Sequence, residues 1–354
     1  MDKVYQFGIV DCVELVLYNH FVIVPYIIVR SWTIEGQCSV FFTISRIDMQ
    51  TDPGLARLAA SITRAASLQT YTTVRLLVDR ERVAQAFQAY AYFRWVDDWL
   101  DEPTRLTSER LAFLDWQRQL IEEYAHGQTV QVRATEEKML IDLLGSDPDE
   151  NSGLHSYMSN MMAVMAFDAE RRGRLISQEE LDHYALSLAT AVTEALHYFI
   201  GHDSASPVGP TRYLAAQGAH IVHMLRDTLE DNALGYFNIP REYIKSSGIS
   251  PFETGSLPFR SWVMKRVQLA RQYFRQGKEY LADVQSLRCR MAGYAYIARF
   301  ETVLNIIERD GYVLRSEYRD ARGALAGARM GWSVFWGACS ARTPLARPGV
   351  APIR

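Results

Sequence analysis

The chain has 354 residues, of which 48% are hydrophobic and 22% charged, and its formal net charge is -3 at pH 7. This composition is typical of a soluble globular protein with a large core, and the charge gives no reason to expect a nucleic-acid partner. The four cysteines, at positions 12, 38, 289 and 339, form no CxxC motif and no Cys/His cluster. We therefore expect free thiols in a reducing compartment and a cytoplasmic protein.

Residues 1–50 form a predicted N-terminal extension. Their longest uninterrupted apolar run, residues 21–29, is shorter than the roughly 20 residues that cross a bilayer, and the segment lacks the basic start of a secretory signal. Two interpretations stay open. The extension is either a membrane-facing segment or a translation of upstream sequence, with the functional chain starting near Met49.

From about residue 54 onward, apolar residues recur at helical spacing, with almost no alternation of the kind that strands show. Ser177 and Glu180 form a capping box before one expected helix, and Gly127 ends another that opens near Ser108. The expected helices cover approximately residues 54–77, 80–101, 108–127, 131–144, 153–171, 177–200, 210–234, 259–284 and 286–310.

The connections between these helices are rich in Gly, Pro, Ser or Asp and are too short to be domain linkers. We therefore predict a single all-α domain at residues 51–335, followed by a disordered tail at 336–354. The apolar segment 324–339 is too short to span a bilayer, and loose peripheral contact with a membrane is the expectation there.

Two pairs of aspartates share one spacing: Asp97 with Asp101, and Asp227 with Asp231. Residues four apart lie on one face of a helix, so each pair points two carboxylates in the same direction. The first pair lies in a stretch rich in Ala, Tyr, Phe and Trp, where buried carboxylates are costly unless a cation meets them. Two such pairs predict one cleft that holds metal ions from both walls.

An arginine accompanies each pair. Arg94 lies about one helical turn before Asp97, and Arg226 directly precedes Asp227. Carboxylates suit a hard divalent ion such as Mg²⁺, which often bridges to substrate phosphates, and arginine binds phosphate oxygens in a fork. The combination favours a metal-bound diphosphate.

Other interpretations of the acids and histidines stay open. One treats the four motif aspartates as surface acids paired with arginines. Separately, Asp98 and Glu102 repeat the spacing on an adjacent face, where they are expected to lie outside the direct metal ligands or in solvent. Glu-x-x-His, a motif of di-iron bundles, occurs at 123/126, 180/183 and 194/197. His220, His223 and Asp227 are spaced to chelate a transition metal. A core or hydrogen-bonding role is the preferred interpretation for the histidines.

The two motifs and their flanks resemble those of the squalene/phytoene synthase family. The family's first motif is similar to Tyr90-Ala-Tyr-Phe-Arg94-Trp-Val-Asp97-Asp98-Trp-Leu-Asp101, and its second to His223-Met-Leu-Arg226-Asp227-Thr-Leu-Glu230-Asp231. Segments around Asp168, before the first motif and near residues 291–312 extend the resemblance over about residues 60–335.

The chain departs from the family pattern at several positions. His223 stands where relatives usually have Asn, and Tyr236 and Asn238 replace an Arg and a Tyr that follow the second motif. Two glycines of a small-residue segment are Thr190 and Thr193 here. These changes leave the product unassigned, whereas the motif aspartates and arginines needed for ionising a diphosphate are all present.

The resemblance implies a helical bundle of the class I isoprenoid synthase type with a central apolar cavity. It implies that two farnesyl or geranylgeranyl diphosphates join head to head through a cyclopropylcarbinyl diphosphate, to a squalene- or phytoene-type product. Mg²⁺ (with Mn²⁺ as the alternative) would bind Asp97, Asp101, Asp227 and Asp231, with Arg94 and Arg226 assisting.

The same resemblance implies substrate contacts for a further set of side chains, which are Tyr90, Asp98, His223, Glu230, Asp168 and Tyr236. NADPH use and oligomeric state stay open, and no Gly-rich dinucleotide loop is evident. Two alternatives to this function are a non-catalytic scaffold of the same superfamily and a class I terpene cyclase.

Overall fold

A computed structural model describes residues 42–44, 52–102 and 104–318. The α-helices of this part are α1 (Pro53–Ala66), α2 (Leu68–Leu77), α3 (Val83–Asp101), α4 (Thr107–Ala125), α5 (Thr135–Gly145), α6 (Gly153–Arg171), α7 (Gln178–Phe199), α8 (Leu214–Leu234), α9 (Arg241–Ser247), α10 (Leu257–Asp283) and α11 (Leu287–Arg309). Two short 3₁₀ helices, Arg80–Arg82 and Pro210–Tyr213, precede α3 and α8. The tail, the segment 324–339 and nearly all of the N-terminal extension lie outside the described residues.

The local signals in the sequence fix several helix ends. The Ser177 hydroxyl accepts a hydrogen bond from the Glu180 backbone N–H (3.1 Å), and the Glu180 carboxylate accepts one from the Ser177 N–H (2.7 Å). This is the predicted capping box, and it starts α7. At the C-terminal end of α8, Gly235 adopts a left-handed conformation (φ 88°) that a side chain would disfavour.

The structure differs from the sequence-based prediction in three places. The helix expected at 54–77 breaks at Ser67, whose extended backbone ends α1 and whose hydroxyl caps α2 by accepting from the Thr70 N–H. A short antiparallel pair joins β1 (Phe42–Ile44) to β2 (Val130–Val132). The short helix α9 lies in a stretch without an assigned element. Strands of three residues are too short to show an alternating pattern, so they could not be predicted from the sequence.

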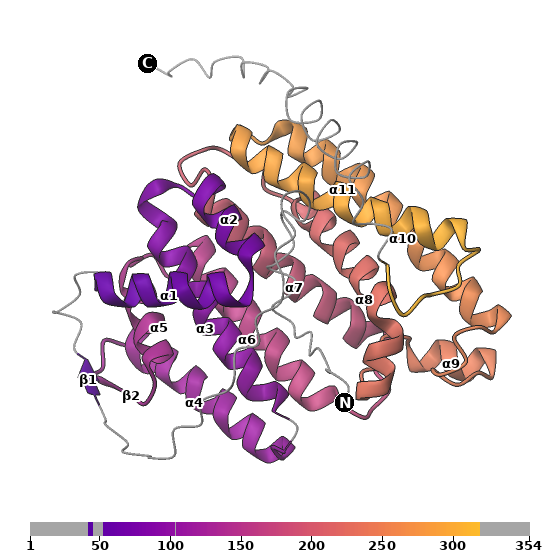
Figure 1. The fold of residues 1–354 in the computed structure, drawn as a ribbon, viewed down its shortest axis with the longest axis horizontal. Helices are drawn as coiled ribbons and strands as arrows, with labels where there is room; N and C mark the ends of the chain where they lie inside the picture. The colour runs from indigo at the N-terminus through magenta and orange to yellow at the C-terminus, as the bar shows by residue number, and fades with distance from the viewer. Residues whose placement is uncertain (1–41, 45–51, 103, 319–354) are drawn as a thin grey trace, which may run out of the picture.

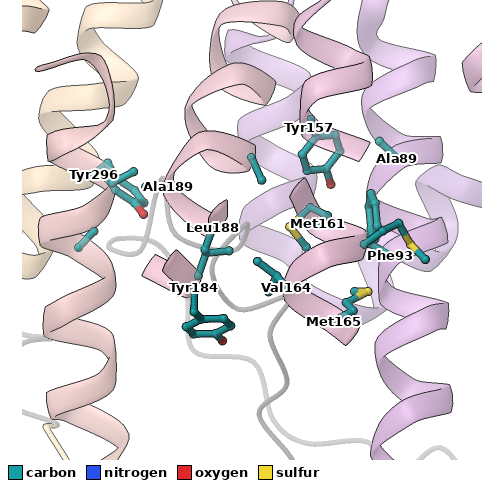
Figure 2. Packing of buried hydrophobic residues seen from close by; sticks show 14 of the residues in the cluster. Ala89, Phe93, Tyr157, Met161, Val164, Met165, Tyr184, Leu188, Ala189 and Tyr296 are labelled. Carbon is teal, nitrogen blue, oxygen red and sulfur yellow. The ribbon is translucent and has the colours of Figure 1, made fainter. Parts of the chain in front are cut away.

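The helices form a layered bundle in which α6 and α7 occupy the middle (Figure 1). Helix α7 packs on α6 and α8, α8 packs on α10 and α11, and α3 packs on α1 and α5. Between α3 and α7, the α6 side chains Met161, Val164 and Met165 fill the core, with Phe93 on one side and Leu188 on the other (Figure 2). None of the helices in the described part is long and apolar enough to traverse a lipid bilayer.

Two glycines allow α8 and α10 to approach closely. A Cβ atom at Gly218 would lie 2.9 Å from the Phe274 ring, and one at Gly277 would lie 3.0 Å from the Ala215 Cα. Backbone atoms of a packed helix cannot move aside as a flexible side chain can. The spacing of these two helices therefore depends on the missing side chains.

Replacement of Gly277 by valine is expected to destabilise the protein by about 1–3 kcal/mol, because the added atoms must push α8 away from α10. The free energy of unfolding in urea measures the effect. Gly255→Val is the control, since a Cβ there meets nothing within 4 Å. Equal stability of the two variants would contradict the close approach.

Candidate diphosphate and metal site

A pocket of about 130 Å³ lies where the C-terminal parts of α3, α6 and α8 meet the first half of α7. Both aspartate pairs face it: Asp97 and Asp101 from α3, Asp227 and Asp231 from α8. The structure therefore places two motifs that are far apart in sequence on the walls of one pocket. Asp97 is itself deeply buried, at 2% exposure.

The other nominated residues divide between the pocket wall and its surroundings. Asp168, His223 and Tyr236 also line the pocket. The remaining nominated residues, Tyr90, Arg94, Asp98, Arg226 and Glu230, are not part of its lining. Substrate contact by this second group stays a prediction.

Arginine contacts around the motifs are short and local. Arg94 donates to both Asp98 oxygens, at 2.5 and 3.1 Å, near an Asp98 side chain that is 58% exposed. Arg226 makes a two-pronged contact with both oxygens of Asp227, at 2.6 and 2.7 Å. Each guanidinium thus holds an acid of its own motif in this structure.

The Asp227 carboxylate is fixed from a second direction, because His223 Nε2 lies 2.8 Å from its Oδ2. Burial alone would raise the pKa of Asp227, but His223 and Arg226 overcome that effect and hold it well below its usual range. A carboxylate has about four lone-pair positions, so three contacts leave room for a cation.

Asp231 belongs to a network of hydrogen-bonded side chains that line the pocket. The Asn238 amide donates to Asp231 (2.6 Å) and accepts from Arg171 (2.8 Å). Arg171 also donates to Asp168 (2.5 Å), whose other oxygen accepts from the Tyr184 hydroxyl (2.8 Å). Side chains from α6, α7 and the segment after α8 thus hold the second aspartate of the second motif.

Backbone pairing places Asn238 where it can make these contacts. The Gly173 N–H donates to the Gly235 carbonyl (2.8 Å), and Leu175 forms a parallel bridge with Phe237. The connection between α6 and α7 therefore lies beside the connection between α8 and α9. Tyr236 belongs to the second of these connections, and its ring lies 5.1 Å from the Arg171 guanidinium.

The electrostatics of the pocket favour a cation. Burial and the nearby charge of Asp227 raise the pKa of Asp231 to about 8, and burial with Asp168 and Asp98 raises the pKa of Asp101. Helices α3 and α8 also end here with no basic residue in the last turn, so the negative ends of their dipoles add to the carboxylates.

Oxygen donors in this setting fit a hard divalent ion such as Mg²⁺. Among the described residues, no group of three or more His, Cys, Asp or Glu side chains is close enough to hold an ion alone. A bound ion would therefore need further oxygen ligands, which suits Mg²⁺ because it keeps waters and bridges to phosphates.

The glutamates of the Glu-x-x-His motifs make hydrogen bonds that have nothing to do with a metal site. Glu194 binds Arg212 through both oxygens, at 2.7 and 2.9 Å, and accepts from the Tyr213 hydroxyl. Glu180 caps α7, and Glu123 accepts from Gln119 on the exposed face of α4. The di-iron interpretation is therefore wrong for the described residues, and hydrogen-bonding roles account for these acids.

Sequence reasoning did not nominate several residues of this pocket. Arg110, Arg171, Arg172 and Tyr184 all line it. Arg172 also donates to the Leu234 carbonyl at the end of α8 (3.2 Å). The available signal was the basic run at 171–174 directly after Asp168, which places three cations at the end of a helix that carries a candidate acid.

Comparison with known proteins places the chain in a family. The family model described as squalene/phytoene synthase matches residues 63–323. Presqualene diphosphate synthase of Zymomonas mobilis is 28% identical over 197 residues, which is 54% of this chain and 62% of that protein. The matched part thus spans less than two thirds of that relative.

Two solved structures share the fold, each with a TM-score of 0.59. Squalene synthase from Alicyclobacillus acidocaldarius is 20% identical, covering 74% of this chain and 96% of the other. A dehydrosqualene synthase bound to a ligand is 16% identical, covering 81% and 96%. At these sequence identities, the similarity to the two structures supports only the all-α fold. The family match covers most of the chain, and the chain therefore belongs to the squalene/phytoene synthase family.

Proposed function

We propose that this protein is a prenyltransferase that joins two prenyl diphosphates head to head in the presence of Mg²⁺. One observation carries the proposal: aspartate pairs from α3 and α8 line a single pocket, where burial and neighbouring acids raise the pKa of Asp101 and Asp231. The family membership and the similarity to a presqualene diphosphate synthase support the same reaction class.

In this proposal Asp97, Asp101, Asp227 and Asp231 would hold the metal. When bound, Mg²⁺ would neutralise charge on the departing diphosphate and act as a Lewis acid. The chain itself fixes two of these acids before substrate arrives, because Arg226 and His223 orient Asp227 while Asn238 orients Asp231. Such preorganised charge stabilises a transition state without reorganisation during the reaction.

The apolar part of the pocket would shield the carbocation from water. Met165, Leu188 and Met224 line it from three different helices. Loss of one diphosphate gives an allylic cation, which bonds to the double bond of the second substrate. Loss of one proton from the resulting cation then closes the ring of a cyclopropylcarbinyl diphosphate. Farnesyl and geranylgeranyl diphosphate are the proposed substrates, with a squalene- or phytoene-type product.

Incubation of the full chain with farnesyl or geranylgeranyl diphosphate and Mg²⁺ tests the proposal. We expect release of inorganic diphosphate, a lipid product of doubled chain length by mass spectrometry, and loss of both with EDTA. No diphosphate release from either substrate would favour a scaffold role. Release with a monomeric cyclic product would favour a terpene cyclase.

Asn238→Ala is expected to weaken metal use without preventing folding. The substitution removes the amide that links Asp231 to Arg171, and loss of such supporting contacts typically costs 10–100-fold in metal affinity or activity. The Mg²⁺ concentration for half-maximal diphosphate release should therefore rise by about 10-fold or more. Asn151→Ala, in an exposed loop, is the control, and an unchanged Mg²⁺ requirement in Asn238→Ala would contradict the role.

A further inference from the structure

His220 is a buried imidazole on the pocket wall that has no hydrogen-bond partner in the part of the chain that the structure describes. It lies on α8 about two helical turns before Asp227 and is 6% exposed. Neither of its ring nitrogens is hydrogen-bonded by any of the residues that the structure describes. An unpaired buried polar group costs about 1–3 kcal/mol, so its position on the lining of a functional pocket calls for an explanation.

The neighbours of His220 keep its ring neutral. The Tyr184 ring lies edge-on at 5.1 Å, and its hydroxyl is already donated to Asp168. The charged and titratable groups that act on it are His223 on α8, Arg171 on α6 and Arg266 on α10. Burial and then these groups lower the pKa of His220 well below 6.5. At neutral pH the imidazole therefore carries a lone pair and no charge.

The proposed reaction produces a proton that must leave the reacting carbons. We propose that His220 accepts this proton as the cyclopropane ring closes. The inference rests on the proposed function and assigns a residue to a step that the aspartates, as proposed metal ligands, would not perform.

The step balances as follows. After the first substrate loses diphosphate, its C1 bonds to the double bond of the second substrate and leaves a tertiary cation. A C–H bond at the same C1 then breaks, and its electron pair closes the ring. The proton goes to a His220 nitrogen, and the resulting imidazolium returns it to released diphosphate or solvent. Two prenyl diphosphates thus give one cyclopropylcarbinyl diphosphate, one diphosphate and one proton.

A weak base is sufficient for this step. The C1–H bond of this cationic intermediate is a far stronger acid than an imidazolium, so a His220 of low basicity still receives the proton. The same low basicity keeps the ring unprotonated between turnovers. A charged imidazolium beside the site would instead repel the cation before it could react.

The test compares wild type with His220→Gln and His220→Phe in single turnovers with farnesyl diphosphate and Mg²⁺. Glutamine keeps polarity without a comparable base, and phenylalanine keeps the ring that packs on Tyr184. Both the released diphosphate and the cyclopropylcarbinyl diphosphate are quantified. His183→Gln, an exposed position on α7, is the matched control.

We expect cyclopropane formation to fall by at least about 100-fold in both variants, in line with the loss of a general base. Diphosphate release should fall much less, with alcohols and elimination products making up the difference, while KM stays within about threefold. A role in packing alone would lower both quantities together. The proposal would be overturned if diphosphate release and cyclopropane formation fell by the same factor. It would also be overturned if either variant formed the cyclopropane product at the wild-type rate.

Failure of the proposed function has a different signature. In that case wild type itself releases no diphosphate from the paired substrates. A C1-deuterated substrate adds an independent measurement in wild type. We expect a primary isotope effect on cyclopropane formation. Its absence, together with His220 variants that still form one cyclopropane product for each diphosphate released, would count against proton transfer to His220.

Discussion

Asp97→Asn on α3 and Asp231→Asn on α8 are each expected to reduce diphosphate release by at least about 1,000-fold, or about 4 kcal/mol of barrier. Each substitution replaces an acid that can ionise against a bound metal by a neutral amide of similar size, on a different wall of the proposed metal pocket. Initial rates with saturating substrate and Mg²⁺ measure the loss. Turnover within tenfold of wild type in either variant would contradict the metal assignment.

Stability should not follow activity in Asp231→Asn. The pKa of Asp231 is about 8 in the folded protein, against 3.8 for an ordinary aspartate, because of burial and the repulsion from Asp227. Between these values the folded state binds a proton that the unfolded chain has lost, so the stability of the metal-free protein falls as pH rises from about 4 to about 8. Asparagine does not titrate, so it removes this pH dependence of stability. Its side-chain oxygen can still accept the hydrogen bond from the Asn238 amide.

Urea unfolding with EDTA at pH 5 and pH 8 measures the effect. We expect the variant to be no less stable than wild type at pH 8 and to depend less on pH. Asp115→Asn is the control for both activity and stability, because Asp115 is 73% exposed on α4. An Asp231→Asn protein that is strongly destabilised at pH 8 would show that the acid supports the fold instead.

Glu194→Met is expected to destabilise the protein by about 3–5 kcal/mol. Glu194 and Arg212 form a two-pronged ion pair in which the side chains are only 14% and 10% exposed. Removal of one partner leaves the other charge buried and uncompensated, which accounts for the size of the loss. Arg212 also donates to the Tyr280 hydroxyl (3.0 Å), so the disturbance extends to α10.

The double variant Glu194→Met/Arg212→Met should recover at least half of that loss, because an apolar pair of similar volume often replaces a buried ion pair without penalty. Diphosphate release per folded molecule should stay within twofold of wild type, since neither residue lines the pocket. A double variant as unstable as the single one would mean that the contacts of Arg212 with other groups dominate.

The positions of the helices could be predicted because their signals are local. The apolar period, the Ser177 capping box and the Gly127 terminator act within a few residues of chain, and the structure confirms them. The break at Ser67 and the pairing of β1 with β2 could not be predicted. The first depends on one hydroxyl capping a backbone N–H, and the second on strands too short to show a period.

The candidate site divides in the same way. The sequence by itself determined that two pairs of carboxylates lie on helix faces with arginines beside them, because a four-residue spacing fixes direction on a helix. Only the tertiary structure decided that both pairs face one pocket and that Asn238 links Asp231 to Arg171. It also decided that His220 has no hydrogen-bond partner among the described residues. Those facts depend on how α6, α7 and α8 pack, and packing joins residues whose separation in the chain carries no signal of their contact.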